Sequence, residues 1–306
     1  MKDTTFFKQA DLLLDCIPYI SLEPNFAIKG GTAINFFYRN LPRLSVDIDL
    51  VYLPVEDWET TLKNIHLALQ KLSSHIEKSF PLVEIKTIPD PNTGNITRLN
   101  IEREGATVKI EPNFVIRGTV FPPEKRMLVK KAQELFEKAV EAQTLSFADL
   151  FASKICAALD RQHPRDLFDV KLLLENEGIT HDVWQAFMVY LISHNRPIVE
   201  LLNPNWKSIQ QEFETNFQGM TIIPITMEEL YHTRDLLVKM IRKALTENDK
   251  KFLLSFKKGK PEWELLSVKH AQDLPAVKWK LLNIKRMSPL KRRQAYQKLA
   301  DYLEKI

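Results

Sequence analysis

The pair Asp47 and Asp49 is the first feature of this sequence whose residue types and spacing could do chemistry. Residues 44–50 alternate apolar and polar side chains without interruption, which predicts a strand with Ser45, Asp47 and Asp49 on one face. Two carboxylates on one face repel each other unless cations neutralise them, and their oxygens suit Mg²⁺. Such a pair can hold two metal ions that stabilise phosphoryl transfer. Taken alone, Asp-x-Asp is more often the solvated half of an amphipathic strand.

A glycine pair followed by threonine, Gly30-Gly31-Thr32, precedes the aspartates and joins a predicted strand at 26–28 to a predicted helix at 32–39. Glycines permit a tight turn and close approach of the backbone to a ligand. A helix N-terminus offers free N–H groups to phosphate, and the Thr32 hydroxyl can cap the helix or donate to a phosphate. We therefore expect a nucleotide-phosphate contact here. A plain strand-to-helix turn is the alternative.

A third carboxylate is expected from a neighbouring strand. Residues 98–103 and 107–115 predict a hairpin whose turn contains Gly105. Glu111 lies on the polar side of its second strand and is our candidate, with an ordinary exposed strand glutamate as the alternative. The weaker candidates are Asp57, Glu102 and Glu104.

Together these segments resemble the core of polymerase-β-type nucleotidyltransferases. Within that superfamily they closely resemble the AbiEii family of abortive-infection toxins, which belong to bacterial toxin–antitoxin systems. The resemblance covers residues 29–50 and continues in order at 149–158, 165–170 and 275–283. Minimal nucleotidyltransferases commonly carry serine where this chain has Thr32, and they have a shorter gap before the aspartates. The longer gap is typical of the AbiEii variety.

Carried over residue by residue, the resemblance implies a site with two Mg²⁺ ions and an NTP substrate. The candidate catalytic residues are Asp47, Asp49, Glu111, Lys154, Asp166 and Asp169, of which the first three are the candidate metal ligands. The candidate nucleotide-binding residues are Gly30, Gly31, Thr32, Ser45 and Lys154. Lys154 is expected near the triphosphate, where a mobile ammonium group is suited to bind. Asp166 and Asp169 share one helix face at i, i+3, although Asp169 could instead form a surface ion pair with Arg165.

The reaction that the resemblance implies is transfer of a nucleoside monophosphate from an NTP to an acceptor, with release of pyrophosphate. Catalysis would come from positioning and charge neutralisation. In related toxins the acceptor is the 3′ end of tRNA, whose modification would block aminoacylation and translation. We therefore expect tRNA or another RNA and a cognate antitoxin as partners. The alternatives are an enzyme that adenylylates a protein hydroxyl and a catalytically silent protein that binds nucleic acid or a partner.

The elements that must position these residues divide the chain in two. Residues 1–125 mix helical and strand patterns, which predicts an α+β polymerase-β-type core with a mixed sheet and flanking helices. Residues 126–306 are nearly all helical and would contribute Lys154, Asp166 and Asp169 together with a basic acceptor-binding surface. Besides 32–39, the predicted helices are 5–17, 56–79, 146–161, 164–178, 181–194, 205–217, 226–247, 276–286 and a last one from 288. The remaining predicted strands are 44–53 and 82–88.

A basic segment without acidic residues runs from Lys278 to Lys298. Its candidate RNA-binding residues are Lys285, Arg286, Lys291, Arg292 and Arg293. Trp279 and Tyr296 could stack on bases, but we expect both to pack into the core. An acidic antitoxin could use the same surface. A second basic cluster, predicted in or near a loop, comprises Lys250, Lys251, Lys257, Lys258 and Lys260.

The composition of the chain limits the classes of protein to which it can belong. The chain has 306 residues, 44% of them hydrophobic, and a net charge of +4, which fits one large globular domain or two smaller ones. Cys16 and Cys156 are expected to be reduced core thiols. The histidines lack metal-ligand spacing, which argues against a zinc site. The sequence shows neither a signal peptide nor a run of membrane-spanning length, so we expect a cytoplasmic protein without membrane contact.

Overall fold

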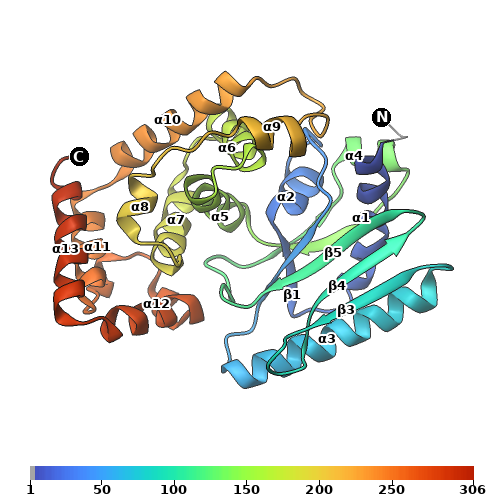
Figure 1. The fold of residues 1–306 in the computed structure, drawn as a ribbon, viewed down its shortest axis with the longest axis horizontal. Coiled ribbons are helices and arrows are strands. Elements are labelled where there is room, and N and C mark those ends of the chain that lie inside the picture. The colour runs from blue at the N-terminus through green and yellow to red at the C-terminus, as the bar shows by residue number, and fades with distance from the viewer. Residues whose placement is uncertain (1–3) are drawn as a thin grey trace. The chain divides into compact units, whose positions relative to one another are not determined.

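The computed structural model describes residues 4–306 (Figure 1). The chain forms two compact units, which are described separately. Unit 1 comprises Met1–Ser146 and Gly219–Pro224, and unit 2 comprises Phe147–Gln218 and Ile225–Ile306. Unit 1 thus continues past residue 125 and includes a short segment from late in the chain.

Unit 1 is built on one seven-stranded sheet with the strand order β3-β4-β5-β2-β1-β7-β6. Its strands are β1 (Phe26–Lys29), β2 (Ile48–Tyr52), β3 (Glu84–Pro89), β4 (Ile96–Arg103), β5 (Ala106–Asn113), β6 (Glu124–Met127) and β7 (Glu141–Thr144). Its helices are α1 (Thr5–Ile20), α2 (Gly30–Ala33), the π-helix η1 (Ile34–Tyr38), α3 (Trp58–Ser79) and α4 (Lys130–Phe136). The β2–β5 and β1–β7 pairs are parallel and the others antiparallel. The predicted α+β fold with a mixed sheet is confirmed.

Helix α3 illustrates how sequence places the layers of unit 1. The Asp57 carboxylate accepts a hydrogen bond of 2.9 Å from the backbone N–H of Thr60 and caps the helix. Ile65, Leu69 and Leu72 recur at helical spacing and are buried. This apolar face packs α3 against β4, beside α1, which packs against β5 (Figure 1). The two helices therefore support the strands that carry the candidate carboxylates.

The hairpin between β4 and β5 has a two-residue turn, Glu104-Gly105. Both residues have positive φ, 53° and 77°, the pattern of a type I′ turn, whose twist matches that of the flanking strands. The turn sets a register in which Leu99 lies opposite Ile110. Counting outward from this turn therefore tells which side chains of β4 face those of β5.

The predicted strand at 44–53 is only partly correct, because regular pairing begins at Ile48. The preceding residues follow an irregular path and bond to the late segment of unit 1. The N–H of Leu44 donates to the carbonyl of Met220 at 2.9 Å, and the N–H of Ile222 donates to that of Pro42 at 2.8 Å. The partners of these hydrogen bonds thus lie in a loop that is separated from the segment by more than half the length of the sequence.

The prediction that residues beyond about 125 are nearly all helical is wrong for two short strands. Glu124–Met127 and Glu141–Thr144 form the antiparallel pair β6–β7, and β7 also pairs in parallel with β1. Their side chains lack a run of β-branched residues. Pairing of β7 with β1 therefore stabilises these strands, although their residues have little intrinsic preference for a strand.

Unit 2 is helical throughout its described elements, as predicted. Its α-helices are α5 (Phe147–Asp160), α6 (Pro164–Asn176), α7 (His181–Ser193), α8 (Ile198–Leu202), α9 (Gln210–Asn216), α10 (Met227–Ala244), α11 (Glu247–Lys258), α12 (Pro275–Arg286) and α13 (Pro289–Leu303), with 3₁₀ turns η2 (Trp263–Leu265) and η3 (Lys269–Asp273). The second basic cluster, predicted in or near a loop, extends from α11 into the loop that follows it, where Lys260 lies. Most of that cluster lies on α11, which a Thr246–Asp249 capping box opens, and Lys257 is buried.

Both cysteines are free and buried, as predicted for core thiols. Burial raises the pKa of the Cys16 thiol to about 12 and also raises that of Cys156. Neither thiolate is therefore populated near neutral pH. From residue 4 onward, the chain has no helix both long enough and apolar enough to cross a membrane.

Candidate active site

Asp49 and Glu111 occupy neighbouring positions in the centre of the sheet. The parallel pair β2–β5 places Asp49 in register with Glu111, and the antiparallel pair β1–β2 places it in register with Lys29. Strands lie about 4.8 Å apart, and residues in register point to the same face. The structure therefore brings together the second predicted aspartate and the predicted third carboxylate. Asp57, one of the weaker candidates, instead serves as the cap of α3.

Arg98 is a site residue that the sequence analysis missed. Its Nη1 donates to Glu111 Oε1 at 3.1 Å, and both side chains are partly exposed. Such a pair contributes only about 0–1 kcal/mol to stability. It therefore orients the Glu111 side chain but leaves it able to move. The signal was present in the hairpin: continuing the register outward from Leu99 and Ile110 sets Arg98 opposite Glu111.

Asp47 lies in the irregular segment before β2, and Thr32 holds its backbone. Thr32 Oγ1 donates to the Asp47 carbonyl at 2.5 Å and lies 3.0 Å from Ser45 Oγ. Thr32 is 0% exposed and Ser45 is also buried. The expected capping role of Thr32 is wrong, since α2 starts at Gly30 with Lys29 as its N-cap. The hydroxyl of Thr32 thus links the glycine turn to the first aspartate.

The two glycines meet the polar residues of the next segment at close range. A Cβ on Gly30 would lie 2.6 Å from Asp49 Oδ2, and Gly30 also has a φ of +68°. A Cβ on Gly31 would lie 2.6 Å from the Arg43 guanidinium and 3.0 Å from Ser45 Oγ. The predicted close approach at this turn is therefore to the protein's own Asp49 and Arg43.

The helix after the glycines differs from the regular helix predicted at 32–39. It starts as α2 and changes to a π-helix, η1, from Ile34 to Tyr38. Asn35 Nδ2 donates to the Gly31 carbonyl at 2.9 Å, adding a side-chain bond to the backbone of the turn. Single-turn π-helices are rare and often occur at functional sites.

The donor set suits a hard cation bound through few protein ligands. Among residues 4–306, no group of three or more carboxylate, histidine or cysteine side chains forms a ready metal cage. Mg²⁺ seldom uses such a cage, because it keeps several waters and binds through one or two carboxylates plus substrate phosphates. Asp49 and Glu111 in register, with Asp47 two residues before Asp49, fit that manner of binding.

Lys154, Asp166 and Asp169 form a buried ion cluster inside unit 2. Lys154 Nζ lies 3.0 Å from Asp166 Oδ1 and 3.0 Å from Asp169 Oδ2, and Lys154 is only 6% exposed. The predicted shared face of the two aspartates is confirmed by their common partner. The alternative of a surface ion pair at Asp169 is wrong, because its side chain is fully buried.

Asp166 remains charged in this cluster. Burial alone would raise its pKa, but the ammonium group of Lys154 and the guanidinium group of Arg161 outweigh that effect and lower the pKa below its usual value. Arg161 Nη2 lies 2.8 Å from Asp166 Oδ2. The cluster is therefore held by mutual neutralisation of charges from α5 and α6.

Most of the candidate RNA-binding residues are exposed at the corner between α12 and α13 in unit 2. Lys285, Arg286, Lys291 and Arg293 are exposed, and Arg292 is partly exposed. The expectation that Trp279 packs into the core is wrong, since Trp279 is 54% exposed. Lys280 is not free for RNA, because its Nζ donates to three carbonyls after α7, at distances of 2.6–2.9 Å.

Comparison with known proteins identifies the family and the fold of this chain. The chain matches the family model described as "Nucleotidyl transferase AbiEii toxin, Type IV TA system" over residues 11–283. Among solved structures it is similar to MenT4, the nucleotidyltransferase toxin Rv2826c from Mycobacterium tuberculosis H37Rv. The TM-score is 0.62 at 13% sequence identity, and the match covers 92% of this chain and 94% of MenT4. At that identity the likeness shows the fold alone. A search of curated proteins finds no match.

Proposed function

Because this chain belongs to the AbiEii family of nucleotidyltransferase toxins from type IV toxin–antitoxin systems, we propose that it transfers a nucleoside monophosphate from an NTP to the 3′ end of a tRNA. The observation that carries the proposal is the register of Asp49 with Glu111 beside the Gly30 turn. The acceptor hydroxyl oxygen forms a bond to the α-phosphorus of the NTP. The bond from that phosphorus to the bridging oxygen breaks, and pyrophosphate leaves.

The carboxylates of Asp47, Asp49 and Glu111 would hold two Mg²⁺ ions in this proposal. The ions would supply neutralisation of the charge on the reacting phosphates and on the attacking oxygen. Glu111 stands beside Asp49 and accepts the proton of the acceptor hydroxyl. Arg98 keeps the Glu111 side chain in position through its ion pair. Positioning and electrostatics together account for most of the catalysis in phosphoryl transfer.

The glycine turn receives the nucleotide phosphates in this proposal. Gly30 and Gly31 leave room for Asp49 and Arg43 beside their backbone, and a side chain at either position would take that room. Thr32 and Ser45 act through the backbone of the segment that carries Asp47, since Thr32 Oγ1 donates to the Asp47 carbonyl. Lys154, Asp166 and Asp169 form a cluster of their own within unit 2, where the two aspartates neutralise the buried lysine and fix its position.

An RNA acceptor is supported by the corner between α12 and α13. It presents exposed lysines and arginines, and the exposed indole of Trp279 lies further back on α12. Positive charges neutralise RNA phosphates, and exposed aromatic rings stack on unpaired bases. A cognate antitoxin is a second partner of this toxin, and its acidic residues would compete with RNA for the same corner.

The direct test of the proposal is a labelling reaction. We expect the purified protein, incubated with Mg²⁺, total tRNA and each α-labelled NTP in turn, to label RNA with at least one nucleotide. EDTA should prevent incorporation of the label, and excess Mg²⁺ should restore it, since the carboxylates need the cation. Gel electrophoresis after nuclease or protease treatment distinguishes labelled RNA from labelled protein.

The outcomes of this reaction separate the competing functions. Label that resists nuclease and disappears with protease would mean that the acceptor is a protein hydroxyl, and the tRNA proposal would be wrong. Absence of label with every NTP would contradict both transfer reactions. Label that persists in EDTA would contradict the metal assignment alone.

Gly30→Ala provides a test of the glycine turn. The positive φ should cost about 1–2 kcal/mol for a residue with a Cβ. The new methyl group would also push on Asp49 Oδ2, because an ideal Cβ at position 30 lies 2.6 Å from that oxygen. A displacement of about 1 Å at a reacting centre can lower the rate about 10²-fold. We therefore expect a loss of transfer activity well beyond the loss of stability, measured by label incorporation and urea denaturation.

Gly105→Ala is the matched control. Gly105 has a similar φ of +77°, but nothing lies within 4 Å of its ideal Cβ position. This variant should lose a comparable amount of stability and keep its activity. Equal activity of the two variants would show that contact with Asp49 at Gly30 does not matter for catalysis.

A further inference from the structure

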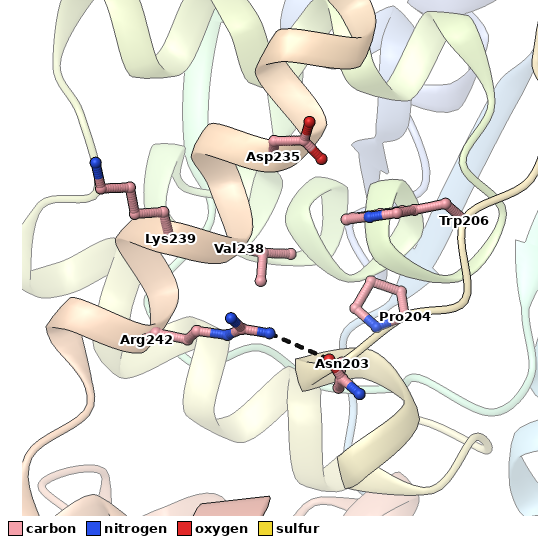
Figure 2. A pocket seen from close by; sticks show the side chains of 7 residues that line it. All are labelled: Asn203, Pro204, Trp206, Asp235, Val238, Lys239 and Arg242. Atoms are coloured by element: carbon pink, nitrogen blue, oxygen red, sulfur yellow. Dashed lines mark hydrogen bonds between the residues drawn. The ribbon is translucent and has the colours of Figure 1, made fainter. Parts of the chain in front are cut away.

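A cavity in unit 2 lies between α10 and the segment that follows α8, and it encloses about 310 Å³ (Figure 2). One wall is formed by Asn203, Pro204 and Trp206. The other consists of Asp235, Val238, Lys239 and Arg242, which recur along one face of α10 at i, i+3, i+4 and i+7. Its volume is at the small end of ligand sites. It would accommodate one nucleotide unit and is too small for a folded helix or a double strand.

Trp206 presents an aromatic face to this cavity. The side chain is 40% exposed. In Figure 2 the indole is seen edge-on, with Pro204 and Arg242 on one side of its plane and Asp235 on the other. The guanidinium carbon of Arg234 lies 4.4 Å from the ring centroid, and Arg234 is not among the residues that line the cavity. Arg234 therefore steadies the ring without filling the space beside it.

The cavity is lined by two cationic side chains, Lys239 and Arg242, and one carboxylate, Asp235. Arg242 Nη2 donates to Asn203 Oδ1 at 3.1 Å, which fixes the guanidinium across the cavity below the indole (Figure 2). Lys239 adds a second, exposed positive charge one turn earlier on α10. The single lining carboxylate, Asp235, lies 4.0 Å from Arg234 Nε, so its charge is partly offset. The cavity thus offers a planar apolar face next to two cations.

We infer that this cavity binds one nucleotide of a single-stranded segment of the acceptor RNA. The base stacks on Trp206, and the adjoining phosphate contacts Arg242 and Lys239. A flat ring beside paired positive charges complements a base and its phosphodiester, the combination that single-strand binding proteins use. An acidic peptide would satisfy the cations but would leave the aromatic face uncovered. The inference rests on the proposed function in one respect, since it takes the strand to be the RNA acceptor.

The test measures RNA binding by the full chain, through the fluorescence anisotropy of a labelled single-stranded oligoribonucleotide. Stacking on one aromatic ring corresponds to between about 5-fold and about 100-fold in affinity. Trp206→Ala should weaken binding by that factor, and Trp206→Phe should restore most of it because a ring remains. Trp58→Ala is the matched control. Trp58 is a similarly exposed tryptophan of unit 1 that also has an arginine, Arg117, over its ring.

The cations are tested by the salt dependence of the same binding. Lys239→Gln should reduce the slope of log affinity against log salt concentration by about 0.7, the value for one phosphate contact in single strands. Lys243→Gln, one turn further on α10, is its control and should leave the slope unchanged, since Lys243 does not line the cavity. A free nucleoside monophosphate should displace the oligonucleotide better than inorganic phosphate does, because its base can stack on Trp206, but less well than the unlabelled strand, which makes further phosphate contacts.

Three results would overturn the inference. They are unchanged affinity in Trp206→Ala, equal losses in Trp206→Ala and Trp58→Ala, and displacement of the strand by a mononucleotide at the strand's own affinity. Label transfer is measured separately. If the wild type labels RNA while Trp206→Ala binds it normally, the cavity assignment fails and the proposed function stands. If the wild type binds the strand through Trp206 but labels no RNA with any NTP, the proposed function fails instead.

Discussion

Replacing Asp49 with asparagine is expected to remove nucleotidyl transfer and leave the fold intact. Asp49 stands in register with both Lys29 and Glu111, so loss of its charge removes half of the central carboxylate pair. Metal-assisted stabilisation of transition-state charge amounts to several kcal/mol, which corresponds to at least about 10³-fold in rate. Asparagine keeps the size and the backbone pairing, so the free energy of unfolding should change little. Label incorporation under saturating NTP and Mg²⁺ measures the effect.

The control for this change is Asp90→Asn. Asp90 lies partly exposed in the turn between β3 and β4, where its Oδ1 accepts hydrogen bonds from the N–H groups of Asn92 and Thr93. Asparagine can keep those bonds, so activity should be unchanged. A companion variant, Glu111→Gln, should also lose most activity, whereas Glu102→Gln on the neighbouring strand should keep it. Wild-type activity in Asp49→Asn would rule out the proposed site.

Lys154→Met is expected to produce the largest loss of stability. The change leaves Asp166 and Asp169 buried close together without their shared ammonium group. Breaking a buried ion cluster in this way costs about 3–5 kcal/mol, because uncompensated charge remains in the interior. The free energy of unfolding from urea denaturation should fall by that amount. Adding Asp169→Leu to Lys154→Met should recover part of the loss, since it removes one of the stranded charges.

Lys171→Met is the control for the lysine change. Lys171 pairs with Glu175 and Glu229 near the surface of unit 2, where an ion pair contributes about 0–1 kcal/mol. Kinetics then separate two roles of Lys154. At a temperature where Lys154→Met is folded, an increased KM for NTP supports contact with the triphosphate. An unchanged KM would restrict Lys154 to holding α5 and α6 together. A loss of stability no larger than that of Lys171→Met would contradict the cluster's structural role.

The site was predictable to the extent that it depends on local pattern. Alternation of side chains placed Asp49 on a polar strand face, and the hairpin signal at Gly105 placed Glu111 on a strand that could lie beside it. The pairing of β2 with β5 could not be read from either segment, because parallel register is set by tertiary packing rather than by a turn. The position of Arg98 opposite Glu111 could also be predicted, by counting residues outward from the turn of the same hairpin.

Other features depended on contacts that leave no local signal. The alternation of apolar and polar residues at 44–47 predicted a strand. The backbone of this segment is irregular instead, and it bonds to a loop at 220–222. The short strands β6 and β7 have no strand-like composition and are formed by pairing with β1 and with each other. Exposure of Trp279 reverses the usual expectation for tryptophan in a helix, because α12 buries a different face through Val277 and Ile284.

The return of residues 219–224 to unit 1 has a consequence for synthesis of the protein. A chain growing from its N-terminus contains Asp47, Asp49 and Glu111 early, but Met220, which pairs with Leu44, is added only after much of unit 2. Contacts that span so much chain form late, because the intervening loop must first close. Completion of the segment leading to Asp47 therefore waits for the second half of the polypeptide. A ribosome that stops before this point releases a product in which the segment leading to Asp47 lacks its hydrogen bonds to residues 220–222.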